Sequence, residues 1–147
     1  DLDTMPDDGH RYELIDGVLI VSPSPIWDHQ RVVRNVLVGL LRNCPESAEV
    51  LTAPFDVVLA NDTVLQPDVL VADISSLTQR GLPGPPLLAV EVLSPSTRSI
   101  DLLLKKERLA RAGLDARQRS DWAHPPRPAL DAVYRFAAPR RVSPRAR

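Results

Sequence analysis

The sequence predicts a single α/β domain, from a hairpin signal near the N-terminus, one long amphipathic helix and two strongly apolar strands. The chain has 147 residues, of which 44% are hydrophobic and 25% charged, which is the composition of a globular domain with one core. No apolar run approaches the roughly 20 residues that cross a membrane, so we expect no membrane segment. The sequence begins at Asp1 without an initiator Met, so we expect further residues to precede it.

The hairpin signal is Asp16-Gly17, which separates the β-rich runs 11–15 and 18–21. Two such runs joined by an Asp-Gly pair are the strongest short-range indication of a β-hairpin. The segment Ser22-Pro23-Ser24-Pro25 ends the second strand. We therefore predict an N-terminal β-hairpin.

A helix is predicted over residues 26–42, where apolar side chains recur at helical spacing and arginines take the other face. Short strands follow at 49–52 and 55–59. Residues 64–72 and 87–93 are nearly continuous in apolar side chains, as in strands covered on both faces. The proline-rich run 81–86 is predicted to be a rigid loop. A second helix, capped by Ser96, Thr97 or Ser99, should end near Ala112, and residues 133–136 can add one more strand.

Two acidic residues, Asp68 and Glu91, lie within these apolar strands. An unpaired carboxylate buried there would cost several kcal/mol, and two of them would repel each other unless a positive charge lay between them. A divalent cation with oxygen ligands meets this need. The alternative is that one or both acids lie at strand ends and point to solvent, or pair with arginines.

The lysines are the third unusual feature, because the chain has 18 basic residues of which only Lys105 and Lys106 are lysine. Lysine is a compact point charge that can orient a metal-bound water and offset charge in a phosphoryl transition state. The alternative for Lys105 is a surface lysine paired with Asp101 one turn earlier. His29, near the start of the first helix, is a candidate ligand or base, or a histidine that bonds locally.

These residues resemble the Uma-two family of restriction-endonuclease-like proteins over roughly residues 8–113. The resemblance implies a restriction-endonuclease-like core, a mixed β-sheet flanked by α-helices, with the PD-(D/E)XK site in a modified form. Leu93 stands where that motif has its lysine, and the lysine has moved to Lys105 on the following helix. The matching segments are Tyr12-Glu13-Leu14-Ile15-Asp16-Gly17, Ser22-Pro23-Ser24-Pro25 with His29, Gln66-Pro67-Asp68, Glu91-Val92-Leu93-Ser94-Pro95-Ser96-Thr97, and Asp101 with Lys105.

The resemblance implies an endonuclease that hydrolyses DNA phosphodiester bonds. Asp68 and Glu91 would hold Mg²⁺ (or Mn²⁺) with the Val92 carbonyl, Glu13 would join the acidic site, and Lys105 would position the attacking water. Cutting a duplex needs two sites, so a homodimer is expected. Two alternatives stay open. One is a catalytically degenerate module that binds DNA or a protein, and the other is a hydrolase of small phosphoesters.

The segment 114–147 departs from the family pattern and is rich in Arg, Pro and Ala. Residues 115–147 hold eight arginines and three acids, a balance of +5 that leaves −6 for residues 1–114. Our hypothesis is a tail translated in a shifted reading frame, with residues 115–132 lacking regular structure. It would serve as a solvated extension or as a phosphate-binding arm. The single cysteine, Cys44, excludes an internal disulfide and predicts a cytoplasmic protein.

Overall fold

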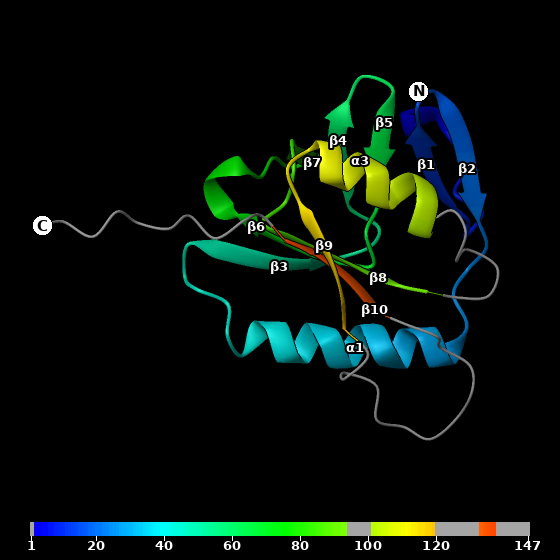
Figure 1. Cartoon of the computed structure of the whole chain (residues 1–147). Coiled ribbons are helices and arrows are strands. Elements are labelled where there is room, and N and C mark those ends of the chain that lie inside the picture. The colour runs from blue at the N-terminus through cyan, green and yellow to red at the C-terminus, as the bar shows by residue number, and fades with distance from the viewer. Residues whose placement is uncertain (1, 94–100, 120–132, 138–147) are drawn as a thin grey trace, which may run out of the picture.

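The computed structural model describes residues 2–93, 101–119 and 133–137 (Figure 1). Ten strands, two α-helices, two 3₁₀ turns and one π-helical turn are described. In chain order they are η1 (Leu2–Thr4), β1 (Arg11–Ile15), β2 (Val18–Ser22), α1 (Trp27–Leu41), β3 (Ala48–Thr52), β4 (Asp56–Ala60), β5 (Thr63–Leu65), β6 (Val69–Asp73), η2 (Ile74–Ser76), β7 (Gly81–Pro83), β8 (Leu88–Val92), the π-helical η3 (Asp101–Lys105), α3 (Lys106–Arg111), β9 (Asp115–Arg119) and β10 (Val133–Ala137).

The strands form two five-stranded sheets. The first has the order β2-β1-β5-β4-β7 and the second the order β3-β6-β8-β10-β9. Neighbouring strands are antiparallel except for the parallel pair β4–β7. This α/β arrangement with an N-terminal hairpin is the restriction-endonuclease-like fold and confirms the predicted fold class. Among the described helices, none combines the length and the apolar character that crossing a membrane requires.

The hairpin forms at the predicted Asp-Gly turn. Ile15 pairs with Val18, so the turn contains only Asp16 and Gly17, and both have positive φ, 53° and 76°. These are the angles of a type I′ turn, whose twist matches the twist of the two strands. The hairpin positions Glu13 in the middle of β1.

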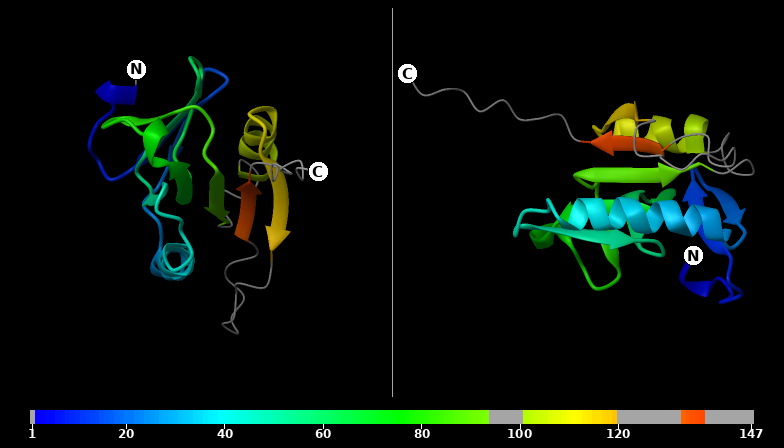
Figure 2. Two further views of the ribbon diagram at one scale, coloured as in Figure 1. Left: turned by 90° about the vertical axis from the view of Figure 1, so that its left-hand side faces the viewer. Right: turned by 90° about the horizontal axis from the view of Figure 1, so that it is seen from below.

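The helices α1 and α3 cover opposite faces of the second sheet (Figures 1 and 2). From α1, Val32 and Val36 pack against Val69, Val90 and Val92. From α3, Leu109 packs against Ala89 of β8 together with Ile15 and Leu65 of the first sheet. Because successive side chains of a strand point to opposite faces, those of β8 point alternately toward α1 and toward the space between the sheets.

The apolar run 64–72, predicted to be one strand, is two strands in different sheets. β5 belongs to the first sheet and β6 to the second, and Gln66-Pro67-Asp68 crosses between them. Pro67 has a fixed φ and no N–H to donate, so the ladder cannot continue through it. The prediction of one continuous strand was therefore wrong. The error affects the candidate site, because the crossing places Asp68 between the two sheets.

The segment predicted to be a rigid loop also contains a strand, since Gly81–Pro83 forms β7 along β4. A Cβ atom on Gly81 would lie 2.6 Å from the Asp56 carbonyl oxygen, so only glycine allows this approach. Pro83 is tolerated because β7 lies at the edge of its sheet.

At the C-terminal end, β10 lies between β8 and β9 and confirms the predicted strand at 133–136. The expectation that residues 115–132 lack regular structure is wrong for Asp115–Arg119, which form β9. Strand pairing uses backbone groups, so a polar segment can complete the edge of a sheet. The cap of the second predicted helix and residues 120–132 lie outside the described residues, and the shifted reading frame stays a hypothesis.

Candidate active site

Five charged side chains meet between the two sheets: Glu13, Asp68, Glu91, Lys105 and Arg11. Four of them are almost fully buried, with exposed fractions of 1% for Glu13, Glu91 and Lys105 and 4% for Asp68. We call this group the acidic cluster. It contains all four residues that were predicted to be catalytic, together with Arg11.

Glu91 enters the acidic cluster because of the alternation along β8. Val90 and Val92 face α1, whereas Ala89 faces the space between the sheets. Glu91 has the same parity as Ala89 and so points the same way. The burial predicted from its apolar strand is confirmed.

Lys105 connects the two sheets through its ammonium group. Its Nζ lies 2.8 Å from Glu13 Oε2 and 3.4 Å from Glu91 Oε1, so β1 and β8 both contribute a carboxylate to it. Lys106, the next residue, is exposed. The alternative of a surface lysine is therefore wrong for Lys105.

Glu13 also fixes the crossing between the sheets. Its Oε1 accepts the backbone N–H of Gln66 at 2.7 Å, while its Oε2 faces Lys105. One carboxylate thus holds the segment next to Asp68 and the lysine at the same time.

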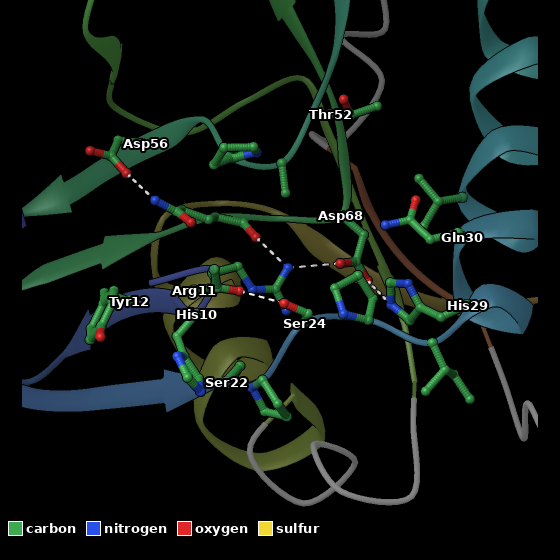
Figure 3. Close-up of a pocket in the computed structure, with 18 of the residues that line it drawn as sticks. His10, Arg11, Tyr12, Ser22, Ser24, His29, Gln30, Thr52, Asp56 and Asp68 are labelled. Carbon is green, nitrogen blue, oxygen red and sulfur yellow. Dashed lines mark hydrogen bonds and ion pairs between the residues drawn. The ribbon is translucent and has the colours of Figure 1, made fainter. Parts of the chain in front are cut away.

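Asp68 accepts three hydrogen bonds or ion pairs, of which Figure 3 shows those with Arg11 and His29. Its Oδ1 lies 2.8 Å from Arg11 Nη1. Its Oδ2 accepts the Val92 N–H at 2.7 Å and lies 3.2 Å from His29 Nε2. Burial would raise the pKa of Asp68, but His29, the Arg11 charge and the Val92 N–H outweigh it and lower that pKa to about 2. The carboxylate is therefore ionised at neutral pH.

Arg11 is the functional candidate that the sequence reasoning missed. Its Nη1 also donates to the Gln66 carbonyl at 3.1 Å, and its Nε lies 3.8 Å from Glu13 Oε2. Burial would lower its pKa, but the charges of Asp68, Glu13 and Glu91 raise it. The available signal was its position two residues before Glu13 in the same strand, which places both side chains on one face.

His29 lies in the first turn of α1 and contacts Asp68 rather than only its own helix. Its Nδ1 is buried and has no hydrogen-bond partner among the described residues. The structure therefore places His29 beside the Asp68 carboxylate and not in a purely local hydrogen bond. Its role as a ligand or base stays a prediction.

A pocket of about 840 Å³ opens onto the acidic cluster. Gln66 lines it, as do Arg11, Asp68 and His29 (Figure 3). Of the three carboxylates in the cluster, only Asp68 lines this pocket. Solvent and ligands in the pocket therefore reach the cluster through Asp68 and Arg11.

Carboxylate oxygens, which the acidic cluster supplies, are the type of donor that Mg²⁺ and Mn²⁺ prefer. Within the described residues, no group of three or more His, Cys, Asp or Glu side chains is arranged to hold a metal ion. Magnesium, however, is commonly held by one or two carboxylates together with water and substrate phosphates. That Asp68 and Glu91 supply those carboxylates stays a prediction. For Val92, its N–H is bonded to Asp68, and the role of its carbonyl as a ligand stays a prediction.

A search of curated protein sequences found no match to this chain. The family model for Uma2, described as "Putative restriction endonuclease", matches residues 1–123. The match extends beyond the 8–113 segment of the predicted resemblance and includes β9. Since it covers most of the 147 residues, and with them the whole acidic cluster, the chain belongs to the Uma2 family.

Proposed function

We propose that this protein is a metal-dependent endonuclease that hydrolyses phosphodiester bonds in DNA. One observation carries the proposal: Glu13 and Glu91 converge on Lys105, next to an ionised Asp68 that lines a pocket. Carboxylates for a metal and a fixed positive charge beside them are what phosphodiester hydrolysis requires. Membership of the Uma2 family supports the same reaction class.

Asp68 and Glu91 would hold Mg²⁺ (or Mn²⁺), with the Val92 carbonyl and Glu13 as further oxygen donors. When bound, the ion would polarise a phosphoryl oxygen and lower the pKa of a water molecule. To hold the ion, the Asp68 carboxyl group must be ionised at neutral pH, and its lowered pKa meets this condition.

Lys105 would position the attacking water and offset the charge that develops on the phosphate. Its ammonium group is held by Glu13 at 2.8 Å and by Glu91 at 3.4 Å. A charge fixed in advance needs little reorganisation during the reaction and acts strongly where water is excluded. The burial of Lys105 is therefore compatible with this role.

DNA would approach through the pocket at Asp68, where His10, Arg11 and Arg34 can meet phosphate oxygens. The net balance of −6 over residues 1–114 predicts weak nonspecific binding. Cutting both strands needs two sites, so we infer a homodimer. We also infer a cytoplasmic location, since the one cysteine, Cys44, is free.

Nicking of supercoiled plasmid tests the proposal, with Lys105→Arg and Lys106→Arg as a matched pair. Both variants make the same chemical change, one at a buried and one at an exposed lysine. We expect Mg²⁺- or Mn²⁺-dependent nicking that EDTA abolishes. Asp68→Asn and Lys105→Arg should nick about 100-fold more slowly, and Lys106→Arg at the normal rate. Circular dichroism checks that each variant is folded, and equal rates for both lysine variants would exclude Lys105 from the reaction.

A catalytically degenerate module that binds DNA or a protein is the second candidate. It is favoured by the fact that the chain supplies cations to all three carboxylates, Arg11 to Asp68 and Lys105 to Glu13 and Glu91. Such a module would bind DNA or a protein but would not nick plasmid DNA, whichever divalent metal is added.

Hydrolysis of bis-p-nitrophenyl phosphate without plasmid nicking would instead indicate a hydrolase of small phosphoesters.

A further inference from the structure

We propose that Arg11 competes with the divalent cation for Asp68. In this inference the guanidinium holds the carboxylate while the metal is absent, and it swings into the pocket when the metal binds. The inference rests on the proposed function, because it takes Asp68 as a metal ligand.

The competition arises at one oxygen atom. Asp68 Oδ2 already accepts the Val92 N–H at 2.7 Å and faces His29 Nε2 at 3.2 Å. The other oxygen, Oδ1, faces Arg11 Nη1 at 2.8 Å. A Mg²⁺ ion on Oδ1 at about 2.1 Å would lie next to the guanidinium. Two cations so close to each other repel, so occupancy by one opposes occupancy by the other.

Arg11 is the cation that is able to leave. Its side chain is 20% exposed, whereas that of Lys105 is 1% exposed and held by two carboxylates. Arg11 also lines the pocket of about 840 Å³, so its guanidinium has space to enter without a movement of the sheet. In the pocket it would be placed to form bidentate contacts with a phosphate group.

Charge balance favours an exchange over joint binding. Among the residues that the structure describes, the three carboxylates of the acidic cluster face the side-chain cations Arg11 and Lys105, and these five groups together carry a net charge of −1. A divalent ion added to that set would make it +1. If Arg11 swings out as the ion enters, the cluster is neutral, which is the least costly state for a buried group of charges.

Mn²⁺ binding measured by calorimetry tests the exchange in the wild type, Arg11→Gln and Arg31→Gln. Arg31→Gln is the matched control, because it removes the same charge from a residue that pairs with Asp28 and lies over the Trp27 ring. We expect Arg11→Gln to bind Mn²⁺ about tenfold more tightly, which corresponds to about 1.4 kcal/mol. Arg31→Gln should stay within about twofold of the wild type. Equal affinity of the wild type and Arg11→Gln would overturn the proposal.

Arg11→Gln removes the cation from a buried carboxylate, so the variant can be unfolded without metal. Thermal melting covers this case: Mn²⁺ should then raise the melting temperature of Arg11→Gln more than that of the wild type. A variant that Mn²⁺ does not restore would count against the inference. A second variant, Arg11→Lys, keeps the charge and should bind Mn²⁺ as the wild type does.

Asp68→Asn separates this inference from the proposed function. If Asp68→Asn abolishes Mn²⁺ binding while Arg11→Gln matches the wild type, the metal site stands and the competition by Arg11 is wrong. If Mn²⁺ binds Asp68→Asn and the wild type equally, or if neither the wild type nor Arg11→Gln binds Mn²⁺, the metal site at Asp68 fails and the inference fails with it.

Discussion

The ammonium nitrogen of Lys105 lies 2.8 Å from a carboxylate oxygen of Glu13, and both side chains are 1% exposed. This ion pair joins the N-terminal hairpin to the helical segment that follows the Glu91 strand. Because Lys105 also faces Glu91, one side chain neutralises charge on both sheets. The first prediction follows from this arrangement.

Lys105→Met should lower the free energy of unfolding by about 3–5 kcal/mol, because it removes the cation that two buried carboxylates share. Lys106→Met makes the same change at an exposed position and should alter stability by less than about 0.5 kcal/mol. Urea denaturation followed by circular dichroism measures both. A Lys105→Met variant as stable as Lys106→Met would mean that the pair contributes nothing net to the fold.

Asp68 should make the metal-free protein sensitive to acid. Its pKa is lowered from 3.8 in the unfolded chain to about 2 in the fold, so its ionised form stabilises the folded state. That contribution is fully present above pH 3.8 and is lost as the pH falls from 3.8 toward 2. The shift corresponds to about 2 kcal/mol.

The measurement is urea denaturation of the wild type and Asp68→Asn between pH 6 and pH 2.5, with EDTA present. The wild type should be more stable at pH 6, and the two curves should converge in acid. Parallel pH dependences would show that Asp68 is not held as an ion in the folded protein.

Metal binding should stabilise the fold through Glu91. A ligand at 100 times its dissociation constant adds about 2.7 kcal/mol to the free energy of unfolding. Mn²⁺ should give this gain in the wild type, and Glu91→Gln should lose most of it. Asp16→Asn, a change in the same hairpin as Glu13 but in the exposed turn, should keep it. Thermal melts with and without Mn²⁺ compare the three, and an unchanged gain in Glu91→Gln would remove Glu91 from the ligands.

The hairpin turn gives a prediction that does not depend on function. Gly17 has φ 76° with no atom within 4 Å of an added Cβ, so only the backbone angle opposes a side chain there. Gly17→Val should cost about 1–2 kcal/mol. Gly17→Asn should cost less, because asparagine tolerates positive φ. Equal losses in urea denaturation would indicate that something other than the backbone angle limits this position.

The sequence by itself determined the local elements and identified Asp68 and Glu91 as acidic residues in apolar segments. The Asp-Gly turn, the long amphipathic helix and the apolar strand around Glu91 are patterns of neighbouring residues, and the structure has all three. Burial of Glu91 followed from an acid placed inside an apolar strand. The role of Lys105 was identified from the resemblance to a family pattern, since its spacing from Asp101 is also that of a surface ion pair.

Only the tertiary structure decided how these pieces meet. The pairing of β7 with β4 and the addition of β9 depend on backbone hydrogen bonds between distant segments, which leave no periodic signal in the sequence. Pro67 explains why the run 64–72 is interrupted, but only the tertiary structure shows that β5 and β6 join different sheets. The tertiary structure also decided the positions of Arg11 and His29, because the crossing at Gln66-Pro67-Asp68 brings a buried carboxylate within 2.8 Å of the first and 3.2 Å of the second.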